Sequence, residues 1–196
     1  MMFSATFPKN ARDLAKEHLA HNHVRIRVGR AGSSHRNIKQ DVVYVESHQK
    51  RTALYDLLMT TPPARTIIFV NSKRTADEVD DHLFNLDLPC TSIHSDRTQR
   101  EREDSIRAFR TGKAPILIAT GVSARGLDIH NVMHVINYDL PSPQYGGIEE
   151  YTHRIGTLYN FLMKFANYFQ VVLAESETWV LQHHSTMTEI QTSLRL

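Results

Sequence analysis

Residues 66–84 read TIIFVNSKRTADEVDDHLF, and this stretch indicates the fold class. Residues 66–70 are a nearly continuous apolar run, which is typical of a strand buried on both faces of a parallel sheet. The residues that follow place Ala76, Val79 and Leu83 on one side of a helix. A buried strand that leads directly into an amphipathic helix is the repeating unit of an α/β fold.

The same alternation continues on both sides of this unit. Thr98 and Glu101 have the spacing of a capping box, which predicts a helix that runs to Arg110 and is closed by Gly112. We therefore expect an open, mainly parallel α/β sheet with helices on its faces. The other expected strands are 24–28, 37–45, 90–94, 115–119 and 132–137, and the other expected helices are 51–59 and 148–155.

Composition limits the class of protein. The chain has 196 residues, of which 41% are hydrophobic and 22% charged, and this excludes a wholly disordered chain. Because 23 Lys and Arg stand against 21 Asp and Glu, any binding of nucleic acid must come from local clusters of basic residues. The single cysteine, Cys90, and the lack of a long apolar run favour a cytoplasmic protein, with a nuclear location as the alternative.

Polar loops follow three of the predicted buried strands. Ligands of open α/β sheets bind at the carboxyl ends of the strands, and hydroxyls, backbone N–H groups and basic side chains there suit phosphate oxygens. The loops therefore suggest a surface that follows a phosphate backbone. The alternative is that Ser72 and Thr98 only cap helices while the arginines are solvated. The loops are 71–74, 95–97 and 120–128.

Other site types are not indicated. GxxxxGK[ST] is absent, so the chain encodes no self-sufficient nucleotide site. The acidic run 77–81 lies on a predicted helix and is expected to be a solvated face. His18, His21 and His23 match no zinc-binding spacing, so no metal ligand is assigned.

Several linked motifs resemble those of the carboxyl-terminal RecA-like half of the DEAD-box ATP-dependent RNA helicases. Residues 65–77 (RTIIFVNSKRTAD) resemble motif IV, residues 91–112 resemble motif IVa with its QxxR, and residues 118–129 (IATGVSARGLDI) resemble motif V. HVINYDLPS (134–142) and EEYTHRIG (149–156) resemble the connection into motif VI. The residues of these motifs are similar to those of the subgroup that contains Vasa and the related translation-initiation helicases.

The resemblance also divides the chain. Residues 2–8 resemble the segment around the SAT motif at the end of the first RecA-like half, so the chain is expected to begin inside a longer protein. Residues 1–22 would be the end of that half with a linker, 23–156 the helicase C-terminal RecA-like domain, and 157–196 an aberrant tail.

The resemblance implies an ATP-dependent RNA helicase whose two RecA-like halves clamp single-stranded RNA, with ATP and Mg²⁺ in the full-length protein and no membrane partner. The amino-terminal half would be the protein partner. Asp128 would contact the ATP ribose, Arg125 would help to close the halves, and His153 would couple to the SAT motif. The residues implied to hold the RNA backbone are Asn71, Ser72, Lys73, Ser95, Asp96, Gln99, Arg102, Thr120 and Gly121. Those implied at the ATP site or between the halves are Ser4, Thr6, Arg125, Gly126, Asp128, His153 and Arg154.

Three departures from the family's pattern bear on activity. The family's HGD reads HSD at 94–96, so Ser95, which has a side chain, replaces a glycine. Residues 142–148 are additional to the family's pattern. HRIGRTGR becomes HRIGTLYN, which puts Thr157 and Asn160 where the family has the two arginines on the γ-phosphate. The chain alone is therefore expected to hold no ATP or Mg²⁺ and to be inactive. The alternative is a non-catalytic RNA-binding or dominant-negative fragment, or a mispredicted gene product.

The composition changes near Gly156, after which charged residues become sparse and aromatic residues frequent. Codons that fit residues 177–196, read two bases later, can encode NLGLATSFYNDRNTDIAPS, which resembles the strand and helix after motif VI. The hypothesis is that residues 157 to about 175 are a retained intron and the rest a shifted exon. The alternative is a genuine tail that packs on the domain.

Overall fold

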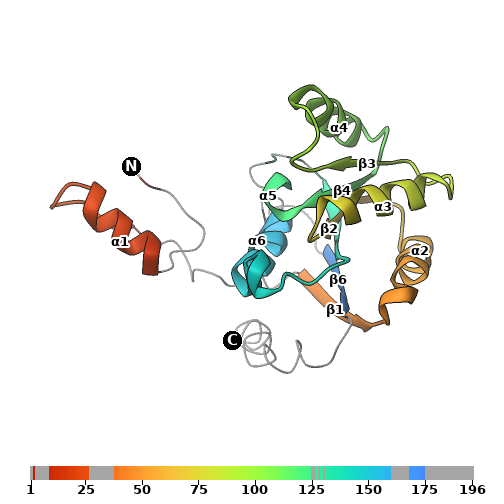
Figure 1. Cartoon of the computed structure of the whole chain (residues 1–196), viewed down its shortest axis with the longest axis horizontal. Coiled ribbons are helices and arrows are strands. Elements are labelled where there is room, and N and C mark those ends of the chain that lie inside the picture. The colour runs from red at the N-terminus through yellow and green to blue at the C-terminus, as the bar shows by residue number, and fades with distance from the viewer. Residues whose placement is uncertain are drawn as a thin grey trace. The chain divides into compact units, whose positions relative to one another are not determined.

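The computed structural model describes residues 2, 9–26, 38–124, 127, 129, 131–159 and 168–174, without the side chains of 38–39, 156–159 and 168–170. The chain divides into two compact units, Met1–Ser33 and Ser34–Leu196. In the described part of the first unit the regular element is helix α1 (Lys9–His18), drawn in red in Figure 1.

The second unit is built around a six-stranded sheet in the order β1-β6-β5-β2-β4-β3. Every pair of neighbouring strands is parallel. This confirms the open parallel α/β sheet expected from the sequence. The strands are β1 (Ile38–Tyr44), β2 (Arg65–Val70), β3 (Cys90–Ile93), β4 (Ile116–Thr120), β5 (Val132–Asn137) and β6 (Tyr168–Ala174).

Helices cover both faces of the sheet (Figure 1). Leu54 and Val79 lie in a hydrophobic cluster that joins α2 and α3 to one face, while Phe109 and Tyr151 lie in a second cluster that joins α4 and α6 to the other. None of the helices among the described residues is long and apolar enough to cross a membrane. The helices are α2 (Lys50–Thr60), α3 (Lys73–Phe84), α4 (Gln99–Thr111), α5 (Gly121–Ala124) and α6 (Gly147–Tyr159), with short 3₁₀ turns at η1 (Ser47–Gln49) and η2 (Pro143–Tyr145).

The local signals read from the sequence define helix ends as expected. The Thr98 hydroxyl accepts a hydrogen bond from the Glu101 N–H at 3.3 Å, and the Glu101 carboxylate accepts one from the Thr98 N–H at 2.7 Å. Gly112 closes α4 with φ of 79°, a left-handed conformation that suits glycine. The capping box and the glycine stop are therefore confirmed.

The strand expected over 24–28 is wrong for the residues that the structure describes there. Residues 24–26 belong to no regular element, and Val24 and Ile26 are more than four-fifths exposed. Alternating apolar residues form a strand only where a neighbouring strand pairs with them, and no pairing involves this segment among the described residues.

The sheet continues past the change of composition at Gly156. Helix α6 runs through Gly156 to Tyr159, and β6 lies between β1 and β5. The side chains of 171–174 are almost fully buried. Strand β6 is also the sheet partner of β1, so residues 168–174 of the expected tail are part of the sheet.

Candidate nucleic-acid interface

The carboxyl ends of three adjacent strands form one edge of the sheet. Strand β4 lies between β2 and β3, and all three are parallel, so the segments that leave them emerge on the same side. Strand β2 leads into α3, β3 into α4 and β4 into α5. The polar loops selected from the sequence therefore meet at the edge where open α/β sheets bind ligands.

An ion pair joins two of these loops. The Lys73 ammonium lies 2.7 Å from an oxygen of Asp96, and both side chains are more than half exposed. The hydrogen bond from Lys73 lowers the pKa of Asp96, so this carboxylate is charged at neutral pH. Ser95 also donates to Asp96 at 3.3 Å. The loops after β2 and β3 thus form a continuous surface, although β4 separates their strands.

The first turn of α4 contributes two further candidate donors. Gln99 is exposed, and its amide donates to Glu103 at 2.8 Å. Arg102 is partly exposed, but its Nε is buried and has no hydrogen-bond partner among the described residues. A buried guanidinium N–H without a protein partner is an unmet donor that an anionic oxygen can satisfy.

Two hydroxyl groups at this edge cap helices. The Ser72 Oγ accepts a hydrogen bond from the Thr75 N–H at 3.1 Å, at the start of α3. Thr98 has the same role at the start of α4. Thr120 donates to the Ser123 Oγ at 3.0 Å. These hydroxyls are therefore engaged within the protein, while Lys73 and Arg102 offer charge to a ligand.

The acidic run 77–81 is only in part the solvated face expected from the sequence: Asp81 is exposed, but Asp77 and Asp80 have partners within the domain. Asp77 accepts a hydrogen bond from Arg97 at 2.9 Å, and the same oxygen lies 3.0 Å from the His94 Nε2. Asp80 accepts one from Ser92 at 2.7 Å. The reason is that α3 packs beside β3, so its acidic side faces the polar side chains of that strand and of the loop after it.

Cys90 belongs to the same cluster. Its thiol donates to the Asp80 carboxylate at 3.1 Å. Burial and the neighbouring Asp80 raise the pKa of Cys90 to about 12, so the group is a neutral thiol at physiological pH. No group of three or more His, Cys, Asp or Glu side chains in the described part of the chain is placed to hold a metal ion.

Arg154, which the resemblance implied at the ATP site or between the halves, is buried in the domain with only 2% of its surface exposed. Its guanidinium donates to the Asn71 Oδ1 at 3.0 Å and to the Asp139 carbonyl at 2.7 Å, and it pairs with Glu150 at 3.4 Å. Burial lowers the pKa of Arg154. The side chain therefore ties α6 to the ends of β2 and β5.

Asn71 is likewise turned into the domain. Its amide donates to the Leu140 carbonyl at 2.7 Å and accepts from Arg154, so both polar groups of the side chain have protein partners. Asn71 and Arg154 hold the edge together instead of facing a ligand with these groups. Sequence reasoning missed two further members of this arrangement, Lys50 and Asp139, because nothing local marks a contact between residues 89 positions apart.

A comparison with protein families matches residues 49–159 to the helicase conserved C-terminal domain. The chain belongs to this family. The matched segment begins just before α2 and ends with α6, so it contains all three polar loops and the buried contacts of Arg154.

Solved structures of DEAD-box proteins are similar to this helicase C-terminal domain. The C-terminal domain of Dbp5 matches with a TM-score of 0.66 and 29% identity, over 80% of this chain and 85% of that one. S. cerevisiae Dbp5 bound to Gle1 and IP6 matches with a TM-score of 0.72 and 29% identity, over 97% of this chain and 46% of that one. E. coli SrmB bound to RraA matches with a TM-score of 0.61 and 26% identity, over 78% and 84%.

These matches support the RecA-like fold and the resemblance to DEAD-box C-terminal domains. The chain spans about half the length of the longer structures that it matches.

Several residues carried over from the family lie outside the residues that the structure describes. His153 lies on α6 and is partly exposed, next to the buried Arg154. The additional residues 142–148 form η2 and the start of α6, joined through Gly146 with φ of 92°. The residues outside the description are Ser4, Thr6, Arg125, Gly126, Asp128 and Asn160, together with the side chain of Thr157.

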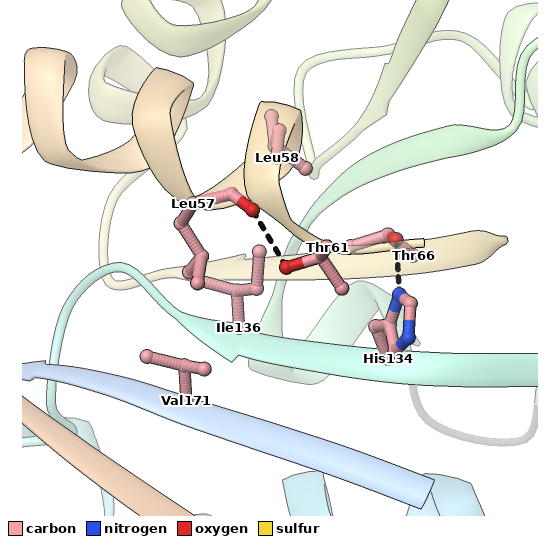
Figure 2. Close-up of a pocket in the computed structure, with 7 residues that line it drawn as sticks. All are labelled: Leu57, Leu58, Thr61, Thr66, His134, Ile136 and Val171. Atoms are coloured by element: carbon pink, nitrogen blue, oxygen red, sulfur yellow. Dashed lines mark hydrogen bonds between the residues drawn. The ribbon is translucent and has the colours of Figure 1, made fainter. Parts of the chain in front are cut away.

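A small hollow in the helicase domain lies between α2 and the strands β2, β5 and β6 (Figure 2). Its volume is about 10 Å³, which is close to the space of one water molecule. The Thr66 Oγ1 lies 3.4 Å from the His134 Nδ1 in its wall. Most of the lining is apolar, so this hollow is too small and too apolar for a nucleotide. It is lined by Leu57, Leu58, Thr61, Thr66, His134, Ile136 and Val171.

Proposed function

We propose that the chain is the C-terminal half of a DEAD-box ATP-dependent RNA helicase and that its polar sheet edge binds the sugar-phosphate backbone of single-stranded RNA. The observation that carries this proposal is the ion pair between Lys73 and Asp96, because it unites the loops after β2 and β3 into one surface. Membership of the helicase C-terminal domain family supports it. The residues of the motifs further suggest the subgroup that contains Vasa and the translation-initiation helicases.

The donors of this surface suit phosphate and sugar oxygens. Lys73 supplies an exposed ammonium, Gln99 an amide, and Arg102 a guanidinium whose Nε has no partner among the described residues. No aromatic residue occurs in the loops 71–74, 95–97 and 120–128 on which bases could stack. The surface therefore holds RNA without selecting its bases. Ser72, Ser95, Asp96, Thr120 and Gly121 complete it.

ATP and Mg²⁺ would be held largely by an amino-terminal RecA-like half. The contribution of this chain would come from Arg125, Gly126, Asp128 and His153, with Ser4 and Thr6 in the SAT motif. Buried Arg154 would support the helix that carries His153. Thr157 and Asn160 cannot supply the positive charge that the family places on the γ-phosphate.

A second function is a non-catalytic fragment that binds RNA, with a dominant-negative effect or without a role of its own. The observation that favours it is the sequence HRIGTLYN at 153–160, which lacks both arginines of the family's pattern. In that case RNA binding at the polar edge remains, while assembly with an amino-terminal half yields no hydrolysis.

The origin of residues 157–196 as retained intron and shifted exon is part of the same proposal. Strand β6, at Tyr168–Ala174, lies within the segment assigned to the intron and fills a place in the sheet, as the alternative of a packed tail requires. Sequencing the transcripts tests the two origins. A spliced message that restores RTGR supports the intron, whereas unspliced message alone supports the packed tail.

The RNA surface is tested by comparing Arg102→Ala with Arg107→Ala. Both arginines lie on α4, but Arg107 lies further from the start of the helix, is mostly exposed and pairs with Asp104 at 3.4 Å. Arg102→Ala should weaken binding to every single-stranded RNA by a similar factor and lower the salt slope by about 0.7, as expected for one phosphate contact on a single strand. Equal effects of the two variants, measured by fluorescence anisotropy, would remove the support for this surface.

A further inference from the structure

The carboxylate of Asp139 lies between two donors that come from different parts of the fold. Its Oδ1 accepts a hydrogen bond from the Lys50 ammonium at 2.6 Å, and its Oδ2 accepts one from the backbone N–H of Asn71 at 3.0 Å. Lys50 is only 4% exposed, and its ammonium also lies 4.4 Å from the centre of the Tyr138 ring. A buried ammonium is stable in a protein only when it is paired, so Lys50 and Asp139 depend on each other.

The backbone amide that binds Asp139 belongs to Asn71, which joins β2 to the helix α3. Asn71 is the first residue after β2, Ser72 caps α3, and Lys73 follows directly. A shift of the Asn71 amide would therefore move both the amino terminus of α3 and the backbone of Lys73. The same residue is held from the other face of the sheet, because Arg154 on α6 donates to its Oδ1.

We infer that Asp139 and Lys50 are positioning residues for the RNA-binding loop 71–74. This inference rests on the function proposed above. Asp139 fixes the loop through the Asn71 amide, and Lys50, at the first turn of α2, neutralises the carboxylate and fixes its orientation. Neither residue touches RNA in this account. They act by fixing the backbone position from which the Lys73 side chain extends.

The geometry requires a carboxylate at position 139. Both of its oxygens face donors, so both must be acceptors. An asparagine offers one acceptor and one NH₂ donor group, and it can satisfy only one of the two neighbours. The charged ammonium binds the single oxygen more strongly than a neutral amide does. Asp139→Asn is therefore expected to turn its NH₂ group toward the Asn71 N–H and release the loop.

A second substitution, at Lys50, should reverse the effect of Asp139→Asn on the loop. If Lys50 is replaced as well, in Lys50→Met with Asp139→Asn, the competing ammonium is gone. The asparagine oxygen can then accept the Asn71 N–H while its NH₂ group faces the place that the ammonium has left. A change to a neutral, similarly shaped pair should restore the loop although it removes an ion pair.

The experiment measures two properties of the full chain at low temperature. Amide hydrogen exchange reports the Asn71 N–H directly, and anisotropy reports the affinity for a fluorescent oligouridylate. Asp139→Asn should speed exchange at Asn71 and weaken RNA binding, each by about tenfold, the size of effect expected for one lost hydrogen bond to a charged group. The double variant should return both values to within about threefold of the natural chain.

Leu54→Ala is the matched control, because Leu54 is fully buried on the same helix as Lys50 but makes no polar contact with the loop. It should lower the melting temperature. The exchange rate of the Asn71 amide, compared with amides in other loops, and the affinity for RNA should both stay unchanged. Unchanged Asn71 exchange in Asp139→Asn, or a double variant that is no better than the single one, would overturn the inference. If the natural chain binds no RNA, the proposed function fails, while the exchange measurement still decides whether Asp139 holds the loop.

Discussion

Glu150 on α6 fills the space beside Gly121 at the end of β4. A Cβ on Gly121 would overlap the carboxylate of Glu150, which is buried and paired with Arg154. Glycine at this position thus allows α6 to approach the polar edge, and it connects the loop after β4 to the buried arginine.

The first prediction follows from this contact. Gly121→Ala should destabilise the domain by about 1–3 kcal/mol, because the added methyl group displaces Glu150 from Arg154. Gly112→Ala is the control, since Gly112 has open space around it and carries only the strain of a left-handed residue, about 1 kcal/mol. Urea denaturation measures both. Gly121→Ala as stable as the natural chain would show that Glu150 moves aside freely.

The second prediction concerns the thiol of Cys90. Because its pKa is raised to about 12, Cys90 in the folded chain should react with iodoacetamide much more slowly than an ordinary thiol at pH about 8. Asp80→Asn should speed alkylation by roughly tenfold or more, since it removes the carboxylate that accepts the thiol proton. Asp81→Asn, which removes a more distant charge, should have a smaller effect. Equal rates in both variants would argue against the Asp80 contact.

The third prediction is a pH dependence of stability. Burial lowers the pKa of His134 below 6.5, the ordinary value, which applies to the unfolded chain. Above that pH both states are neutral and His134 has no effect. As the pH falls through 6.5 the unfolded chain binds a proton first, so the free energy of unfolding decreases.

His134→Asn tests this dependence, because it keeps a polar group near Thr66 but cannot titrate. Its free energy of unfolding should fall less than that of the natural chain between pH about 7 and about 5. Urea denaturation at several pH values gives the two curves. Parallel curves would assign the pH dependence to other groups.

Local patterns in the sequence were sufficient for most of the fold. The apolar run 66–70, the side of α3 that carries Ala76, and the capping box of α4 each depend on neighbouring residues only, and each is confirmed. The strand expected at 24–28 failed for its described residues, because pairing depends on a partner that the pattern does not include.

The site needed contacts that no local pattern contains. Lys50 reaches Asp139 across 89 positions, and Asp77 meets Arg97 only because α3 lies against β3. Likewise, the composition change at Gly156 gave no sign that residues 168–174 would occupy the place between β1 and β5. The sequence therefore located the polar loops, while the structure shows which of their side chains have partners within the domain.

The fourth prediction concerns hydrolysis. Mixed with a separately expressed amino-terminal RecA-like half and RNA, this chain should release no phosphate from ATP. Thr157 and Asn160 cannot replace arginines whose charge is worth about 10³ to 10⁵ in rate in nucleotide hydrolases. Thr157→Arg with Asn160→Arg should restore a small RNA-stimulated rate. Robust turnover with the natural Thr157 and Asn160 would contradict the assignment of the two positions.

The most direct test of RNA-backbone binding is a salt titration of the natural chain with two single-stranded RNAs of unrelated sequence. If Lys73 and Arg102 contact phosphates, the logarithm of the binding constant should fall linearly with the logarithm of the salt concentration, by about 0.7 per phosphate contact. The two RNAs should bind with affinities within about threefold of each other at every salt concentration. Binding that does not depend on salt, or a preference of more than about tenfold for one RNA, would contradict the account.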